Sequence, residues 1–120
     1  MGYKVIDGTA MTADIASALI DISDVTHVSL HITTATTGTQ DHEGVIYFRQ
    51  TNVNSISSPI PVAITTPTVT INTSAVANDF VELSDLTGRY LQVFYDRTGG
   101  GTDDTLTVRV WRKRNNVYTN

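Results

Sequence analysis

The chain has 120 residues, no cysteine and a formal net charge of −4 at pH 7. This length suits one domain with one hydrophobic core, which we expect to span residues 1–120. The missing cysteines exclude a disulfide framework and thiolate metal ligands. No apolar run reaches the roughly 18 residues of a bilayer-spanning helix, and the acidic balance argues against nucleic acid. Neither a membrane nor a nucleic acid is therefore an expected partner.

Threonine, valine and isoleucine make up more than a third of the residues, and threonine alone occurs 20 times. β-branched side chains lose rotamer freedom in helices and pack well on a pleated sheet. Short apolar runs recur about every ten residues, and the connections between them are too short for the helical crossovers of a parallel sheet. The sequence therefore predicts an all-β, antiparallel β-sandwich of about eight strands.

The first strand is expected at residues 3–7. Residues 14–23 fit either a helical turn or extended chain, and we expect extended chain in their second half. Residues 25–33 alternate cleanly, so that one face carries Val28, Leu30 and Ile32 and the other carries His27, Ser29 and His31. Further strands are expected at residues 45–51, 62–64, 68–73 and 78–83, with Pro67 separating the second from the third.

The region that follows reads as a strand at residues 90–95, a glycine-rich turn and a strand at residues 105–111. The last strand alternates apolar with polar or aromatic residues, which is the period of a half-buried strand. The turn, at residues 96–104, contains three successive glycines that permit positive φ and chain reversal. Because it is longer than a two-residue hairpin turn, we expect a mobile tip in which the glycines are partly redundant.

Basic residues gather near the end of the chain, where four of the eight lysines and arginines lie: Arg109, Arg112, Lys113 and Arg114. They form either a solvated strand end or a docking segment for an acidic partner surface. Trp111 lies among them, on the face opposite the apolar residues of its strand. There it either packs beneath the N-terminal segment or anchors a protein interface.

His27 and His31 share a strand face, but four residues along a strand span about 13 Å, too far for one metal ion. We therefore expect surface or interface roles for both. The acidic loop residues match no calcium-loop spacing, and neither a nucleophile elbow nor a phosphate loop occurs. No metal, cofactor or catalytic residue is expected, and the protein is not expected to be an enzyme.

Two stretches resemble a known family: HVSLHITTATTGTQDHEGVIYFRQTNV and FVELSDLTGRYLQVFYDRTGGGTDDTLTVRVWRK. The first has a strand, a Thr-Gly-Thr turn and a second strand. The second has Leu-Ser-Asp, an aromatic-rich strand, a glycine turn and a final strand ending in lysine. This order resembles small β-sandwich proteins of tailed bacteriophage virions over residues 14–114. Residues 52–60 depart from the pattern, because the tryptophan that often follows a turn there is missing.

The resemblance implies a jelly-roll-like fold and a structural role as a capsid decoration, or cement, protein that binds and stabilises the outer shell. The partners it implies are a major capsid protein or another virion protein, with self-association into a homo-oligomer, in a virion assembled in the host cytoplasm. Segments 1–12 and 115–120 are the candidate arms for strand exchange with a neighbour.

Two alternatives to this role stay open. One is a carbohydrate- or receptor-binding module in which Tyr47, Tyr95 and Trp111 stack on sugar rings. The other is a head–tail connector or tail accessory subunit.

Overall fold

The computed structural model describes residues 2–52, 62–71, 78–84, 86–114 and 117–118, with the backbone alone over residues 62–67 and 117–118. All the regular secondary structure in these ranges is β-strand, as the composition predicted. The strands are β1 (Tyr3–Ala10), β2 (Ile15–Ala16), β3 (Ile20–Asp21), β4 (His27–Thr36), β5 (Glu43–Thr51), β6 (Val62–Ile71), β7 (Asn78–Leu83), β8 (Tyr90–Gly99), β9 (Asp104–Arg114) and β10 (Val117–Tyr118).

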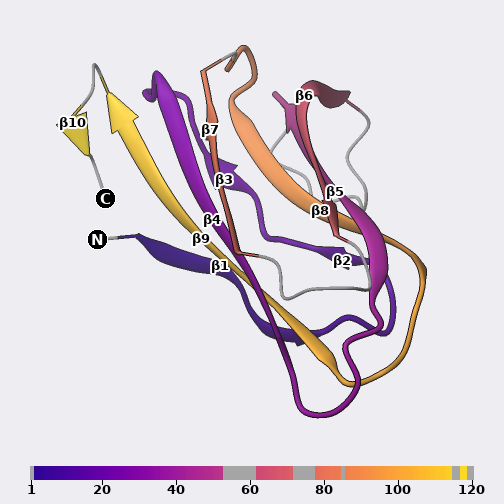
Figure 1. The fold of residues 1–120 in the computed structure, drawn as a ribbon. Coiled ribbons are helices and arrows are strands. Elements are labelled where there is room, and N and C mark those ends of the chain that lie inside the picture. The colour runs from indigo at the N-terminus through magenta and orange to yellow at the C-terminus, as the bar shows by residue number, and fades with distance from the viewer. Residues whose placement is uncertain (1, 53–61, 72–77, 85, 115–116, 119–120) are drawn as a thin grey trace.

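The strands form two antiparallel sheets that pack face to face (Figure 1). Sheet A has the order β1-β9-β4-β7, and β10 also pairs with β9. Sheet B has the order β2-β8-β5-β6, and β3 also pairs with β8. Because β2 and β3 follow one another along the same strand β8, they are two pieces of one interrupted strand. If β2 and β3 are counted as one strand and the short β10 is left out, the described residues form eight principal strands, the number predicted.

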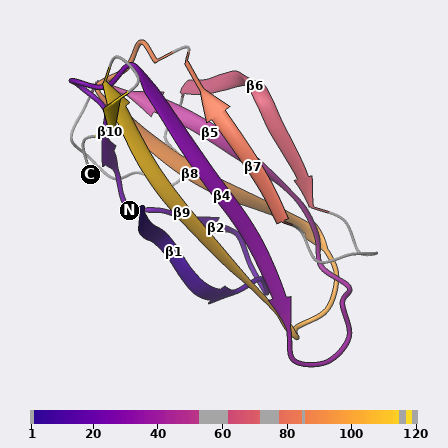
Figure 2. The same cartoon turned by 60° about the vertical axis from the view of Figure 1, so that its left-hand side comes forward.

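The strand pairs are nested along the chain: β1 with β9, β2 and β3 with β8, β4 with β7, and β5 with β6. A long antiparallel hairpin wrapped around itself produces this nest, with β5 and β6 paired in sheet B at its closed end. This is the topology of a jelly roll, and Figure 2 shows its two layers from a second direction. The fold class expected from the sequence is therefore confirmed.

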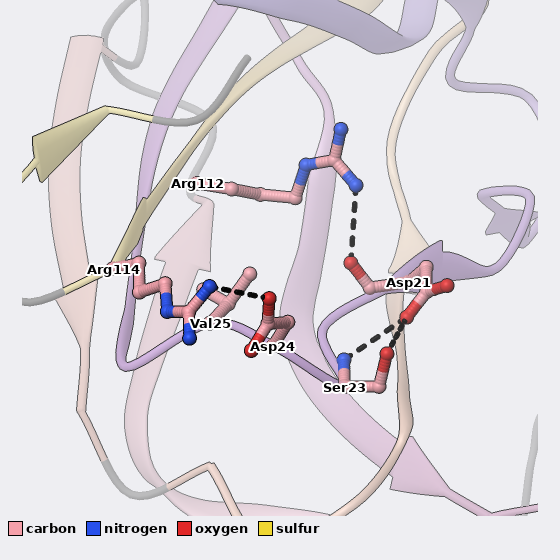
Figure 3. Close-up of a pocket in the computed structure, with 6 residues that line it drawn as sticks. All are labelled: Asp21, Ser23, Asp24, Val25, Arg112 and Arg114. Atoms are coloured by element: carbon pink, nitrogen blue, oxygen red, sulfur yellow. Dashed lines mark hydrogen bonds and ion pairs between the residues drawn. The ribbon is translucent and has the colours of Figure 1, made fainter.

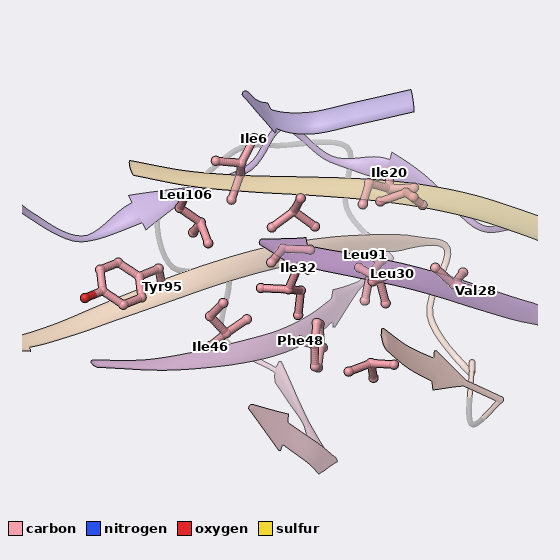
Figure 4. Close-up of a cluster of buried hydrophobic side chains, with 14 of the residues drawn as sticks. Ile6, Ile20, Val28, Leu30, Ile32, Ile46, Phe48, Leu91, Tyr95 and Leu106 are labelled. Atoms are coloured by element: carbon pink, nitrogen blue, oxygen red, sulfur yellow. The ribbon is translucent and has the colours of Figure 1, made fainter. Parts of the chain in front are cut away.

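The core fills the space between the sheets (Figure 4). Val28, Leu30 and Ile32 of β4 are fully buried, which confirms the alternation predicted for this strand. They belong to one cluster with residues of sheet B such as Ile46 and Phe48. Burying a side chain of this size is worth about 1.5–3 kcal/mol. The inner faces of the sheets therefore stabilise the fold, and their outer faces are available for binding.

Two segments have a conformation that the sequence left open or predicted differently. Residues 14–23 are extended, as β2 and β3, and Ile15, Ile20 and Ile22 all turn into the core, so the helical alternative does not occur. Strand β6 is continuous rather than split in two. Its register with β5 shifts between the pairs Ile46↔Val69 and Phe48↔Ile64, so the extra residues of β6, Pro67 among them, fall in the irregularity.

The two loops at one end of the sandwich pack on each other, because β4 reaches Thr36 and β8 reaches Gly99 and the loops are short. The Thr37 N–H donates to the Asp103 carbonyl at 3.0 Å, and the Gly101 N–H donates to the Asp41 carbonyl at 3.2 Å. Gly100 has a φ of 104°. A Cβ there would collide with the Asp41 carbonyl oxygen and would lie 2.7 Å from the Cα of His42. The predicted redundancy of the glycines is therefore wrong at Gly100.

The N-terminal segment lies in the sandwich. Strand β1 pairs with β9 from Tyr3↔Val110 to Ala10↔Thr105, and Met11 is buried. Near the other end, β10 pairs with β9, while residues 115–116 and 119–120 lie outside the described residues. Most of segment 1–12 is thus an edge strand of the chain's own sheet and not a free arm.

Candidate interface on the outer face of sheet A

The outer face of sheet A collects most of the interface residues that the sequence predicted. Along β9, Val108 and Val110 turn inward, so Arg109, Trp111 and Lys113 turn outward. The register places the predicted histidines beside them, because His31 pairs with Arg109 and His27 pairs with Lys113. Five of the seven predicted residues therefore share one face.

An aromatic pair lies at the centre of this face. Phe80 of β7 is 64% exposed, and its ring centroid lies 6.4 Å from that of Trp111, with the planes tilted by 41°. The two rings lie diagonally across β4, because Trp111 pairs with Ser29 and Phe80 pairs with His31. Ser29 is fully buried. On the side of β1, Gly2 lies against the indole so closely that a Cβ would come within 2.7 Å of the ring carbon Cδ2. Trp111 is therefore half-buried under the N-terminal residues, while Phe80 stays open. The interface role of Trp111 stays a prediction.

Phe80 was not singled out from the sequence, although the signal was present. Val81 and Leu83 turn into the core, so the period of two places Phe80 on the opposite face. A large apolar side chain on an outward position is the unusual feature here, because exposed aromatics mark interaction sites when they are grouped. We call the group of Phe80, Trp111, His31 and Arg109 the outer patch.

The charges around the outer patch are largely paired within the chain. Lys113 Nζ lies 3.3 Å from Glu82 Oε2, and Lys4 Nζ lies 3.1 Å from Asp7 Oδ1. His31 Nε2 shares a hydrogen bond with Asn78 Oδ1 at 2.7 Å. Within the described ranges, the side chain of Arg109 has neither an ion pair nor a hydrogen bond. Arg109 is thus the basic group of the patch that a partner would find available.

The Lys113–Glu82 pair should contribute little to stability. Glu82 is 46% exposed, and exposed ion pairs are screened by water and salt. We expect Glu82→Gln to change the free energy of unfolding by less than about 1 kcal/mol, measured by urea denaturation. A loss of more than about 2 kcal/mol would mean that Glu82 holds β7 in place by more than this pair.

The other two basic residues, Arg112 and Arg114, alternate with Arg109, Trp111 and Lys113 along β9 and so turn to its opposite face. There they line a hollow (Figure 3). Arg114 Nη1 pairs with Asp24 Oδ2 at 2.8 Å, and Arg112 Nη1 donates to the carbonyl of Asp21 at 3.2 Å. Together with Ser23 and Val25 they line a hollow of about 360 Å³. The side-chain and backbone hydrogen bonds from Ser23 hold the pKa of Asp21 below its ordinary value. The basic end of the sequence is therefore divided between two surfaces.

His42 and Asp104 form a buried pair that joins the two packed loops. The pair lies at the start of β9, at the end opposite Arg112 and Arg114. His42 and Asp104 are 1% and 2% exposed, and His42 Nδ1 lies 2.6 Å from Asp104 Oδ2. The same oxygen accepts the N–H groups of Asp41 and His42 at 3.1 and 3.0 Å. Burial raises the pKa of Asp104, but its hydrogen bonds outweigh burial and bring the pKa below the ordinary value. Because both side chains are closed to solvent, the pair holds structure rather than binding a substrate.

The tyrosines predicted to stack on sugar rings do not form one platform with Trp111. Tyr95 lies in the core, donates its hydroxyl to the Glu43 carbonyl at 2.8 Å, and has a pKa raised to about 12 by burial. Tyr47 lies on the other sheet, where the guanidinium of Arg49 lies 5.3 Å from its ring centroid. The prediction that Tyr95 stacks on a sugar ring is therefore wrong, because its side chain is buried in the core.

No family model and no curated protein matches the chain. In the described part of the chain, no three or more His, Asp or Glu side chains group in a way that suits a metal ion. The same part contains no helix with the length and apolarity that crossing a membrane requires. The geometry of the outer patch is thus the main observation from which a function can be argued.

Proposed function

We propose that this protein is a structural virion protein, a capsid decoration protein that binds the outer surface of an assembled shell and stabilises it. The observation that carries the proposal is the outer patch, where exposed Phe80 lies beside Trp111, and near Arg109, which has no ion pair or hydrogen bond in the described part of the chain. Aromatic residues and arginine are enriched where proteins bind one another, and they supply most of the binding energy there.

The jelly roll supports this role through its stiffness. The patch residues come from β4, β7 and β9, which lie side by side in sheet A and are held by continuous backbone pairing. A docking surface built on paired strands loses little conformational freedom when it binds, so more of the contact energy appears as affinity. Binding to the assembled lattice in preference to free subunits raises shell stability by mass action.

The proposed partner is a major capsid protein or another virion protein, and the proposed location is the virion. The chain itself is proposed to assemble as a homo-oligomer on the shell. Because β1 pairs with β9 in the chain's own sheet, the docking surface is proposed to be the sheet face and not an N-terminal arm.

A sedimentation experiment tests the role. We expect the protein to be found among the components of isolated particles. The purified protein should co-sediment with emptied shells but should not associate with free coat subunits. Phe80→Ser should weaken shell binding by about tenfold or more without lowering the melting temperature, because the side chain is exposed. Absence from particles, or equal binding to free subunits, would overturn the proposal.

A carbohydrate-binding module is the second candidate, and the patch gives it one specific observation. The open ring of Phe80 has polar neighbours in His31 and Asn78, which share a 2.7 Å hydrogen bond. Aromatic rings beside polar groups also suit sugars. A glycan array probed with the protein and with Phe80→Ser separates the two candidates, since reproducible binding lost in the variant favours this one.

A further inference from the structure

We infer that the outer patch recognises a carboxylate-bearing segment of a protein partner, and that Arg109 selects it. The inference rests on the proposed function in one respect, because it takes the outer patch as the docking surface. It goes further by giving the chemistry of the bound segment: an acidic side chain beside an apolar one.

The first step is the balance of charge on the outer face of sheet A. Each of the two acidic side chains found there in the described residues, Asp7 and Glu82, already pairs with a lysine. Among the described residues Arg109 is the charge left over, and its neighbour on β1 is Lys4, whose charge Asp7 balances. The face is therefore positive at its centre, although the chain as a whole has a net charge of −4.

The second step is the cost of covering Arg109. A guanidinium in water needs no protein partner, but one that is buried beneath another protein loses its hydration. A partner that seats on Phe80 and Trp111 also covers Arg109, because Arg109 lies two residues from Trp111 and on the same face. That partner must supply an acceptor. A carboxylate fits best, since it matches the two parallel N–H groups of a guanidinium.

The third step is the spacing between the two parts of the patch. Arg109 and Trp111 are separated by about 7 Å along β9, and Phe80 lies in the same row as Arg109 with His31 between them. His31 is already engaged with Asn78. The bound segment therefore presents its apolar side chain to the two rings and its carboxylate to Arg109, within one or two residues of each other in an extended chain.

Nucleic acid fits this surface poorly. Phosphate backbones are bound by rows of available lysines and arginines, whereas here Lys4 and Lys113 are paired with carboxylates. The observations thus favour a protein segment, and nucleic acid becomes an outcome to be tested.

The test is selection from a displayed library of random peptides on the immobilised full chain, with removal of peptides that also bind Phe80→Ser. We expect the selected peptides to carry Asp or Glu within two residues of an apolar side chain. The affinity of the selected peptides is then measured in solution. Arg109→Gln should weaken binding by about tenfold or more and make it less dependent on salt concentration. Lys113→Gln is the matched control on the same strand and face, and it should change binding by less than about threefold.

Several results would overturn the inference. These are selected peptides without acidic residues, equal losses in Arg109→Gln and Lys113→Gln, an empty selection, or binding of a single-stranded oligothymidylate in competition with the peptides. The outcome is separable from that of the proposed function. Acidic peptides bound through Arg109 without any shell binding would sink the decoration role alone. Shell binding that survives Arg109→Gln would sink the present inference alone.

Discussion

Replacing Asp104 with asparagine is expected to lower the free energy of unfolding by about 3 kcal/mol at pH 7. The carboxylate is 2% exposed, and one of its oxygens accepts from His42 Nδ1 and from two backbone N–H groups. An amide oxygen in its place can still accept from these donors but carries no charge, and the NH₂ group then takes the buried position of Oδ1, which has no hydrogen-bond partner among the described residues. Urea denaturation monitored by tryptophan fluorescence measures the loss.

The same variant should change the acid dependence of stability. The pKa of Asp104 is lowered in the folded protein, so its contribution is fully present above the unfolded value of about 3.9 and is lost as pH falls through the folded value. Wild type should therefore approach Asp104→Asn in stability below about pH 4. Asp21, whose pKa is also lowered, is common to both proteins, so the difference between their curves isolates Asp104.

Asp103→Asn is the matched control, one residue away in the same loop. Asp103 is only partly buried, and its Oδ2 accepts the N–H of Thr39 at 3.0 Å. We expect a loss of about 1 kcal/mol or less. Equal losses in the two variants would mean that the loop tolerates no amide at either position and that the buried pair has no special weight.

Gly100→Ala is expected to cost about 3 kcal/mol, because two penalties combine at this residue. A φ of 104° is unfavourable for a residue with a Cβ, which costs about 1–2 kcal/mol. The new methyl group would also collide with the backbone of residues 41–42, and relieving such a collision costs about 1–3 kcal/mol. Thermal denaturation followed by circular dichroism should show a clearly lower melting temperature.

Gly8→Ala separates the two penalties. Gly8 also has a positive φ, of 59°, but nothing lies within 4 Å of a Cβ built on it. This variant should therefore lose only the conformational part, about 1 kcal/mol. If Gly100→Ala cost no more than Gly8→Ala, the loops at this end would yield easily and the packing of residues 41–42 on Gly100 would be loose.

The parts of the fold that the sequence predicts are those that depend on local alternation. Val28, Leu30 and Ile32 were placed in the core from their period alone, and the same period put Trp111 opposite the core. Applied one step further, it separates Arg112 from Arg109 and exposes Phe80. The outer patch was thus largely within reach of the sequence.

Other features depend on pairing between distant strands, which no local pattern contains. Glu82 meets Lys113 across 31 positions, and His42 meets Asp104 across 62. The demand for glycine at position 100 is likewise set by Asp41 and His42 in another loop. These contacts follow from the nested topology, so the sequence could suggest a glycine turn but not which glycine is obligatory.

The position of β9 in sheet A has a consequence for how the chain folds. This strand lies between β1 and β4, yet Gly8 of β1 and its hydrogen-bond partner Thr107 of β9 are separated by 99 positions. During synthesis, which adds about 5–20 residues per second, β1 and β4 wait for seconds with unpaired edges until β9 emerges from the ribosome. Sheet A therefore closes only after nearly the whole domain is available, and such distant pairings make folding slow. In that interval the open edges of β1 and β4 are exposed to pairing with other chains.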